Sequence, residues 1–346
     1  MENKNIIFSN QAWSELGRYL HNADFRTVAV VKDFNLTELF WDELKEYIPR
    51  KIKIIEVDGV NLKKIGANHC FSVECVIGFG GGTNIDQAKM IALESKCSLV
   101  IVPTKPTAAI ASRVASIETL EGRATIETPE ARAVFIKKGI LIPEELLVSE
   151  CGDMLSSWSA IPDAVLAHIR GKENAKMELL MGAYKRGERI FEIENVCEEE
   201  SIELLYSLSL EIGIIGDKYG STRPSSGTEH KISHAIDEVL KNKKRKLHGE
   251  QVSFGVLCSL YLQEEHDLLH KHLKQFGFSK IKPSDFKVYL GKIGLPRSFE
   301  ELGVRGPEVI STLARARIVR PEPRYTIIDE LTNDRVIEIL KDNVYF

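Results

Sequence analysis

The stretch that decides the fold is CVIGFGGGTNIDQAKMIALE, residues 75–94. A short apolar run ends in glycines at 78, 80, 81 and 82, and an amphipathic segment follows directly. Glycine lets the backbone turn sharply and approach a ligand, while the free N–H groups and dipole at a helix N-terminus favour an anion. The spacing is neither the GxGxxG fingerprint nor a Walker A loop, since Thr83 stands where a third glycine is required. The stretch therefore predicts a strand, a tight turn and a helix, with either a bound phosphate or only a close connection.

Two charged residues, Asp86 and Lys89, lie on the first turns of this predicted helix. Acids are stabilised near a helix N-terminus, so Asp86 is explained equally well by the dipole or by a ligand. Lys89 is explained equally well as a solvated base or as a binding residue.

The segments around this stretch repeat the same alternation of strand and helix signals. Short apolar runs lie at 27–33, 51–58 and 98–104, and amphipathic segments lie at 10–21, 36–47 and 84–95. This order predicts an α/β domain whose parallel sheet is covered by helices on both faces. Residues 112–137 interrupt the alternation with a predicted hairpin that turns at Glu121 and Gly122.

The pattern changes from about Pro143 onwards, where apolar residues recur at helical spacing. The predicted helical segments are 153–170, 175–195, 198–214, 229–240 and 250–263. They predict an all-α helical bundle. A chain of 346 residues is also longer than one core usually supports, so we expect two domains, residues 1–148 and 149–346.

Composition excludes several classes of protein. The net charge of -4 opposes nucleic-acid binding, and the longest apolar runs are far shorter than the roughly 20 residues of a membrane helix. The first residues show no basic region followed by an apolar stretch, so we expect no secretory signal and a cytoplasmic location. The six cysteines are scattered without a CxxC pair, which predicts reduced thiols.

Histidines and one acid form the candidate metal site. His230 and His234 are four residues apart in a predicted helix and therefore share a face. Together they could bind one ion, or one could bind it while the other lies beside the substrate; an ordinary packed pair is equally consistent. His248 opens the next helical segment, and Asp153 is the acid that could complete the set, unless it only caps the first turn of a helix. A second cluster, at 266, 270 and 272, stands in a strongly charged segment and is predicted to be a solvated helix face.

Five ordered motifs carry a resemblance to a known family. They are GFGGGTNIDQAK (78–89), IVPTKPT (101–107), CGDMLSSWSAIPD (151–163), RPSSGTEHKISHAID (223–237) and LHGEQVSFG (247–255). In this order they resemble the iron-containing alcohol dehydrogenase and dehydroquinate synthase-like superfamily, most closely its sn-glycerol-1-phosphate dehydrogenase branch. The resemblance implies a Rossmann-like NAD(P)-binding domain, a helical domain that binds metal and substrate, and a site in the cleft between them.

The resemblance also assigns roles to individual residues. NAD or NADP would lie along Asp33, Gly80, Gly81, Gly82, Asp86, Thr104 and Thr107, with Asp33 at the adenosine end and the glycines at the pyrophosphate. Asp153, His230 and His248 would bind one divalent metal, usually zinc, although iron or nickel also suits the set. His234 would lie beside the substrate and relay a proton. The implied enzyme is a homo-oligomer that interconverts a small polyol, or its phosphate, and the corresponding ketone by hydride transfer.

The chain departs from the branch in one segment. PTKPTAAIASRVASI stands where the branch reads PTAASHDGIASPRASI, so Ala108 and Ala109 replace an Asp-Gly pair near the substrate. The substrate could therefore differ, and Lys105 and Arg113 are new charges that either bind an anion or lie on the surface. Arg223 is a further candidate anion contact. Two alternatives remain open: a sugar-phosphate cyclase of the dehydroquinate synthase kind, and a family member that has lost catalysis.

Overall fold

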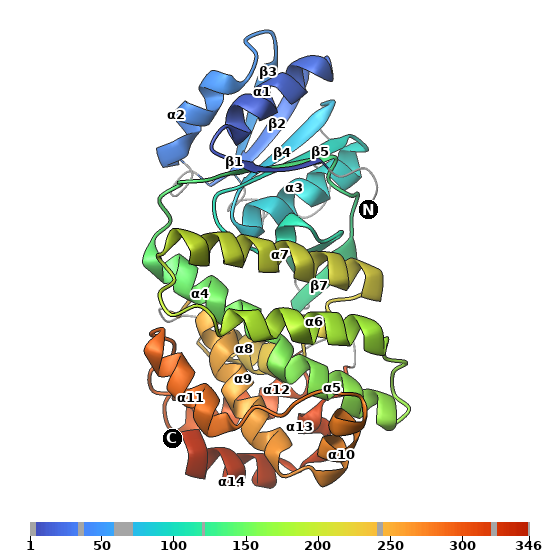
Figure 1. Cartoon of the computed structure of the whole chain (residues 1–346), viewed down its shortest axis with the longest axis vertical. Helices are drawn as coiled ribbons and strands as arrows, with labels where there is room; N and C mark the ends of the chain where they lie inside the picture. The colour runs from blue at the N-terminus through green and yellow to red at the C-terminus, as the bar shows by residue number, and fades with distance from the viewer. Residues whose placement is uncertain are drawn as a thin grey trace. The chain divides into compact units, whose positions relative to one another are not determined.

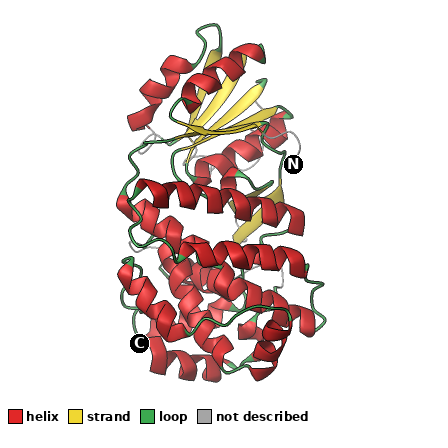
Figure 2. Cartoon of the chain, viewed as in Figure 1, coloured by secondary structure: helices red, strands yellow, loops and turns green. Residues whose placement is uncertain are grey.

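The computed structural model divides the chain into two compact units, Met1–Ile142 and Pro143–Phe346. The described residues are 5–33, 38–58, 72–119, 122–240, 245–319 and 324–344. All strands that these residues form belong to the first unit, and helices make up the second (Figures 1 and 2). The expected boundary between residues 148 and 149, with the roles of the two domains, stays a prediction.

A parallel sheet of six strands forms the centre of the first unit, in the order β1-β8-β5-β4-β2-β3. Its strands are β1 (Asn5–Ser9), β2 (Thr27–Lys32), β3 (Lys53–Asp58), β4 (Cys75–Gly80), β5 (Ser98–Pro103) and β8 (Ala133–Lys137). The predicted α/β class and the four apolar runs are thereby confirmed. Strands β1 and β8, which pair at one side of the sheet, were not predicted.

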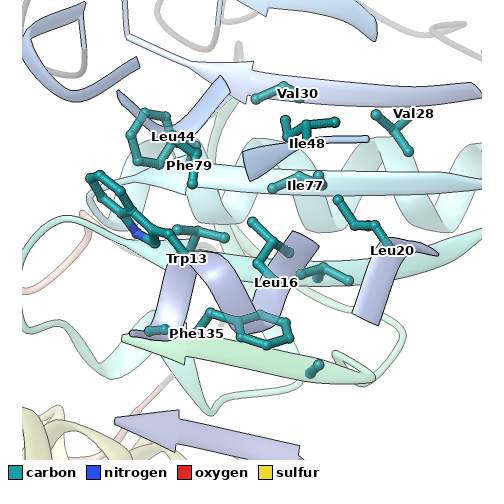
Figure 3. Close-up of a cluster of buried hydrophobic side chains, with 14 of the residues drawn as sticks. Trp13, Leu16, Leu20, Val28, Val30, Leu44, Ile48, Ile77, Phe79 and Phe135 are labelled. Atoms are coloured by element: carbon teal, nitrogen blue, oxygen red, sulfur yellow. The ribbon is translucent and has the colours of Figure 1, made fainter. Parts of the chain in front are cut away.

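Alternation along β4 explains how helices cover both faces. Ile77 and Phe79 point into a core with α1 (Ala12–Asn22) and α2 (Glu38–Tyr47), where Trp13 meets Phe79 edge to face with ring centroids 6.2 Å apart (Figure 3). Gly78 faces the other way, toward α3 (Gly82–Ser95), and a Cβ there would lie 2.9 Å from the Cβ of Ala88. Because side chains alternate along a strand, one strand serves both layers. The absent side chain of Gly78 lets α3 lie close to the sheet.

The predicted hairpin is confirmed as β6 (Val114–Thr119) paired antiparallel with β7 (Gly122–Glu127). Glu121, part of the predicted turn, lies outside the described residues. Lys89 fastens the hairpin to α3, because its ammonium group donates to Asp86 at 3.1 Å, Ser112 at 3.3 Å and the carbonyl of Val114 at 2.8 Å. The interpretation of Lys89 as a solvated base is therefore wrong, since the residue is fully buried.

The second unit is a helical bundle, as predicted. Its helices are α4 (Glu144–Met154), α5 (Ser157–Ile169), α6 (Met177–Ile190), α7 (Glu199–Tyr219), η3 (Arg223–Ser225), α8 (Thr228–Val239), α9 (His248–Glu264), α10 (Asp267–Gln275), α11 (Pro283–Lys292), α12 (Pro307–Ala316), α13 (Ile327–Glu330) and α14 (Asn333–Val344). Helix α9 has buried residues on every side and packs against α4, α8, α11 and α14, which makes it the central helix.

One helix in this unit differs from the prediction. Residues 144–154 form α4, whereas the predicted segment began only at residue 153 and ran to 170 without a break. Among the described residues, no helix has the length and apolar character that a bilayer crossing requires. The cysteines within the described residues are free thiols at 75, 97, 151, 197 and 258, while Cys70 lies outside them.

Candidate metal and cofactor sites

Three side chains from three helices meet in the second unit: Asp153 of α4, His230 of α8 and His248 of α9. One oxygen of Asp153 lies 3.6 Å from Nε2 of His230 and 3.7 Å from Nε2 of His248. These distances are too long for hydrogen bonds. Two ligands about 2.1 Å from one tetrahedral ion stand about 3.4 Å apart, so the spacing fits a common ion. The donor set of one carboxylate and two imidazoles therefore suits a divalent metal.

Asp153 lies at the end of its helix, in the second-last position of α4. The alternative interpretation, an acid that caps the first turn of a helix, is therefore wrong. A helix C-terminus carries partial negative charge and disfavours a carboxylate. A nearby positive charge would relieve this unfavourable placement, as an ion bound to the carboxylate would.

Arg186 of α6 supports the end of α4 from the protein interior. Its guanidinium donates to the carbonyl of Met154 at 3.0 Å and to Ser157 at 2.8 Å. Burial lowers the pKa of Arg186 to about 10, although the Glu211 and Asp153 carboxylates oppose that shift. Arg186 thereby holds the backbone of Met154, the residue that follows Asp153 in the chain.

Glycines allow the three helices to approach closely enough for their side chains to meet. A Cβ on Gly249 would overlap the carbonyl oxygen of Ser149, and one on Gly152 would lie 2.5 Å from the carbonyl of Gly249. On the same central helix, a Cβ on Gly255 would lie 2.5 Å from the carbonyl of Glu229. Two of these glycines directly adjoin candidate ligands in the chain. The helix crossings thereby set the separation of the ligands.

A buried carboxylate fixes the ring of His230. Glu229, which is fully buried, lies 2.9 Å from Nδ1 of His230 and also accepts hydrogen bonds from Ser159 and the backbone of Gly227. An ionised carboxylate only accepts, so Nδ1 of His230 donates and Nε2 faces Asp153 with its lone pair. Sequence reasoning missed Glu229, although it directly precedes His230 in the motif.

His234 lies beside the three-residue group without belonging to it. Its ring centroid is 6.1 Å from those of His230 and His248, and the residue is 8% exposed. It therefore borders the site from one turn further along α8. This position leaves its predicted role next to the substrate untested.

The remaining charged candidates of this unit are structural. Arg223 is buried and donates to Glu173 at 2.8 Å, to the carbonyl of Asp163 at 2.9 Å and to that of Tyr325 at 2.6 Å. A contact between Arg223 and a bound anion stays a prediction. Burial raises the pKa of Asp163 against the opposing charge of Arg223, and its carboxylate accepts from the backbone of Thr228 at 2.7 Å. This pair anchors the start of α8.

The second histidine cluster is only partly a solvated face. His266 caps α10 by accepting from the backbone of Leu269 at 3.1 Å, and His270 is 2.9 Å from the carbonyl of Glu264. His272 is also partly buried, and its Nδ1 lies 2.9 Å from the carbonyl oxygen of Leu268. The interpretation as a solvated face is thus wrong for the first two residues.

The basic run Lys241–Lys246 joins α8 to α9, as predicted for a connection between helices. Residues 241–244 lie outside the described residues. Its last two members are about half exposed: Arg245 pairs with Asp237 at 3.2 Å and Lys246 with Glu250 at 3.3 Å.

The predicted cofactor residues of the first unit gather at the carboxyl ends of its strands. The strand order reverses between β2 and β4, which are neighbours in the sheet. Strand β3 lies on the far side of β2, whereas β5 and β8 lie on the far side of β4. Open α/β sheets bind ligands at such a point. Gly80 ends β4 there with a φ of 137°, a conformation that side chains rarely tolerate, and Asp33 follows β2.

The start of α3 lies beside these strand ends. Gly81 is the N-cap and contributes no side-chain hydrogen bond, so no side chain of the N-cap residue occupies the first N–H groups of α3. A Cβ on Gly82 would lie 3.1 Å from the hydroxyl oxygen of Thr107, and the backbone of Thr104 donates to Gly80 at 3.1 Å. The structure thus brings together the glycines and both threonines.

Asp86 is the least suited of the predicted cofactor residues. Its carboxylate accepts from Lys89 at 3.1 Å and from the backbone of Ser116 at 3.0 Å. Both oxygens therefore bind the hairpin to α3. A cofactor contact at Asp86 stays a prediction.

Lys105 and Arg113, the two charges in the segment that differs from the family branch, have different surroundings. The stem of Lys105 lies against the glycine turn, 3.3 Å from where a Cβ of Gly81 would stand. Arg113 forms an exposed pair with Glu127 at 3.2 Å, which confirms the surface interpretation for this residue. Ala108 opens a short 3-10 helix, Ala108–Ile110, directly after Thr107.

Comparisons with known proteins agree with this architecture. A family model described as iron-containing alcohol dehydrogenase matches residues 7–142. The glycerol-1-phosphate dehydrogenase [NAD(P)+] of Pyrococcus furiosus is 34% identical over 271 residues, which are 76% of this chain and 72% of the relative. The chain belongs to the iron-containing alcohol dehydrogenase family. Within it, relatives with the glycerol-1-phosphate dehydrogenase name align over most of the chain.

Solved structures share the fold at lower identity. A probable glycerol dehydrogenase from Sinorhizobium meliloti 1021 superposes with a TM-score of 0.71, at 21% identity, over 98% of this chain and 96% of that one. A sulfoacetaldehyde reductase from Bifidobacterium kashiwanohense, in complex with NAD+, gives 0.72 at 14% identity over 99% and 98%. Both support the arrangement of a Rossmann-like unit followed by a helical one.

Proposed function

We propose that the protein is a metal-dependent NAD(P) oxidoreductase that interconverts a small polyol, or a polyol phosphate such as glycerol 1-phosphate, and its ketone. The observation that carries the proposal is the carboxylate oxygen of Asp153, placed 3.6 and 3.7 Å from the Nε2 atoms of His230 and His248. The names of relatives that are 30% or more identical supply the substrate class and the cofactor.

Asp153, His230 and His248 would hold the divalent ion, with the lone pair of His230 already directed at Asp153. When bound, the ion supplies Lewis acidity to the carbonyl or alkoxide oxygen, and the nicotinamide supplies or accepts the hydride. Zinc is the ion we propose, because one carboxylate and two imidazoles are a donor set that suits it. His234 would exchange a proton with the substrate hydroxyl.

The glycine turn would bind the pyrophosphate of NAD or NADP. Gly81 leaves the first N–H groups of α3 without a side-chain cap, and such groups bind phosphate. Thr104 and Thr107 border the same turn, and Asp33 would lie at the adenosine end. Free thiols throughout the described residues fit a reducing compartment, which supports the cytoplasm as the proposed location. Assembly into a homo-oligomer stays a prediction.

A direct assay tests the proposal. NADH and NADPH oxidation would be followed with dihydroxyacetone phosphate, dihydroxyacetone and other small ketones, with and without added zinc. We expect metal-dependent oxidation with at least one ketone. Because Ala108 stands where the branch carries an aspartate, the unphosphorylated and phosphorylated ketones are compared side by side. Absence of turnover with every ketone, in protein shown to contain one ion per chain, would overturn the proposal.

A further inference from the structure

A chain of hydrogen bonds leads from the second imidazole into the protein. Nδ1 of His248 lies 3.3 Å from the hydroxyl of Ser233, which lies 3.2 Å from the side-chain oxygen of Gln251. The amide nitrogen of Gln251 donates to Asp237 at 3.1 Å and to the carbonyl of Lys246 at 3.0 Å. Ser233 and Gln251 are 0% and 1% exposed, so water cannot substitute for these partners.

The direction of every bond in this chain follows from its far end. A carboxylate and a backbone carbonyl only accept, so both amide protons of Gln251 are committed to Asp237 and Lys246. The amide oxygen of Gln251 must then accept the single proton of Ser233. The Ser233 oxygen is left as an acceptor toward His248, and Nδ1 of His248 must donate to it.

We propose that Ser233 and Gln251 are positioning residues that hold His248 in its Nδ1–H tautomer before any metal binds. The inference rests on the proposed metal site. With the proton on Nδ1, the lone pair of Nε2 faces the Asp153 oxygen 3.7 Å away. Glu229 fixes the same tautomer in His230, so both imidazoles present lone pairs to one point.

The two supports differ in charge, which gives the ligands different characters. His230 donates to a buried carboxylate, whereas His248 donates to a neutral hydroxyl whose orientation depends on Gln251. A carboxylate partner raises the basicity of a ligating imidazole more than a hydroxyl does. His248 is therefore the ligand whose tautomer can be changed without introducing an unpaired buried charge.

Two substitutions separate positioning from simple packing. Ser233→Ala removes the acceptor for Nδ1 and leaves the tautomer of His248 undetermined. Gln251→Met keeps the volume but removes the acceptor of the serine proton, so Ser233 can donate to Nδ1 and favour the opposite, Nε2–H tautomer. The matched control is Ser259→Ala. Ser259 is a fully buried serine of α9, the helix that carries Gln251, and it donates to the carbonyl of Gly255 at 2.8 Å.

The experiment has two readouts on the whole chain. Nitrogen NMR of isotope-labelled histidine in the metal-free protein reports which ring nitrogen carries the proton, and competition with a chromophoric chelator measures zinc affinity. We expect the Nδ1–H form of His248 in the unmodified protein and in Ser259→Ala. We expect its loss in both test variants, with zinc affinity lowered about 10- to 100-fold.

The outcomes distinguish this inference from the proposed function. If the unmodified protein binds no zinc, iron or nickel, the metal site itself fails. If it binds metal while Ser233→Ala and Gln251→Met retain both its tautomer and its affinity, only the positioning role is overturned. A loss of affinity equal to that of Ser259→Ala would likewise reduce the two residues to packing.

Discussion

Asp153 is the residue on which both imidazoles converge, so its charge decides whether the group binds an ion. Asp153→Asn keeps the shape but removes the negative charge. We expect zinc affinity to fall by more than the roughly 10- to 100-fold typical for the loss of an outer partner, because a ligand itself is changed. Metal content after dialysis measures the loss. Glu145→Gln, an exposed carboxylate-to-amide change on the same helix, is the control, and equal metal content in both variants would contradict the assignment.

His234 separates proton transfer from metal binding. We expect His234→Ala to retain zinc, because the ring lies outside the three-residue group. Its kcat should fall about 10²- to 10⁴-fold if the imidazole relays the proton of the substrate hydroxyl. His272→Ala, a change in a partly buried histidine of α10, should leave kcat unaltered. Unchanged turnover of His234→Ala across the pH range would remove the residue from the reaction.

Glu330 forms an ion pair with Arg170 whose contribution to the stability of the helical unit depends on pH. Two hydrogen bonds from Arg170, each 2.7 Å long, hold the pKa of Glu330 at about 2. The pKa in the folded protein lies below the usual 4.5, so the stabilisation is fully present above pH 4.5 and is lost as pH falls through about 2. Urea unfolding should therefore show a larger difference between the unmodified protein and Glu330→Gln at neutral pH than in acid.

The exposed pair of Arg335 and Glu338 provides the comparison for Glu330. Its carboxylate is 64% exposed, and exposed pairs contribute little to stability. Glu338→Gln should give almost the same unfolding free energy as the unmodified protein at every pH. An equal and pH-independent effect of both substitutions would show that the bidentate contact to Arg170 is not the cause.

Among the elements, the crossing of α4 and α9 is the contact on which the site depends. Gly249→Ala places a methyl group where the Ser149 carbonyl stands. We expect a loss of about 3 kcal/mol or more in unfolding free energy, because backbone cannot move aside as a side chain can. Zinc affinity should fall as the helices separate.

Gly182→Ala is the control for this crossing. Gly182 is also helical, but its nearest neighbour is a methyl group of Ile215, 3.7 Å from the position of a Cβ. Alanine is the better helix former, so this change should stabilise the protein by about 0.5 to 1 kcal/mol. If both substitutions gave the same change in urea midpoint, the close crossing would not explain the glycine at 249.

The elements that the sequence predicted well are those whose secondary structure follows from their own residues and not from contacts with distant parts of the chain. Runs such as TVAVVK and SLVIVP lie inside the sheet, are buried and are apolar almost throughout. Their composition alone was therefore sufficient to predict strands. The edge strand NIIFS is short and half exposed, and β8 follows a hairpin that obscured it. Helix α4 ends where Gly152 meets α9, a contact between residues far apart in sequence.

The candidate site shows the same limit. Helical spacing placed His230 and His234 on one face and made Asp153 a candidate acid, but only the family resemblance assigned Asp153 the role of a ligand. Burial overturned the interpretation of Lys89 as a solvated base, since spacing does not reveal how deeply a cation lies. The partners of the imidazoles, Glu229 and Ser233, became visible only through their distances to the rings.

For the whole molecule, the two proposed ligands bind different compact units: the nucleotide cofactor binds the first unit, and the metal ion binds the second. Hydrogen exchange should show that zinc slows exchange in α4, α8 and α9, while ADP slows it at the β4–α3 turn. Ligand that binds only the folded form stabilises by about 2.7 kcal/mol at 100 times its Kd, so protection factors should rise about 100-fold wherever exchange requires unfolding of the bound unit. Protection by ADP confined to the second unit would contradict the assignment of the glycine turn.

The glycine crossings of α9 also bear on which ions the protein accepts. Because backbone rather than flexible side chains sets the distance between α4, α8 and α9, these helices bring the same three ligand residues together whatever ion is present. Calcium prefers 6 to 8 oxygen ligands, whereas this group offers one carboxylate and two imidazole nitrogens. The helix crossings thus present a set of donor atoms that disfavours calcium before any ion arrives.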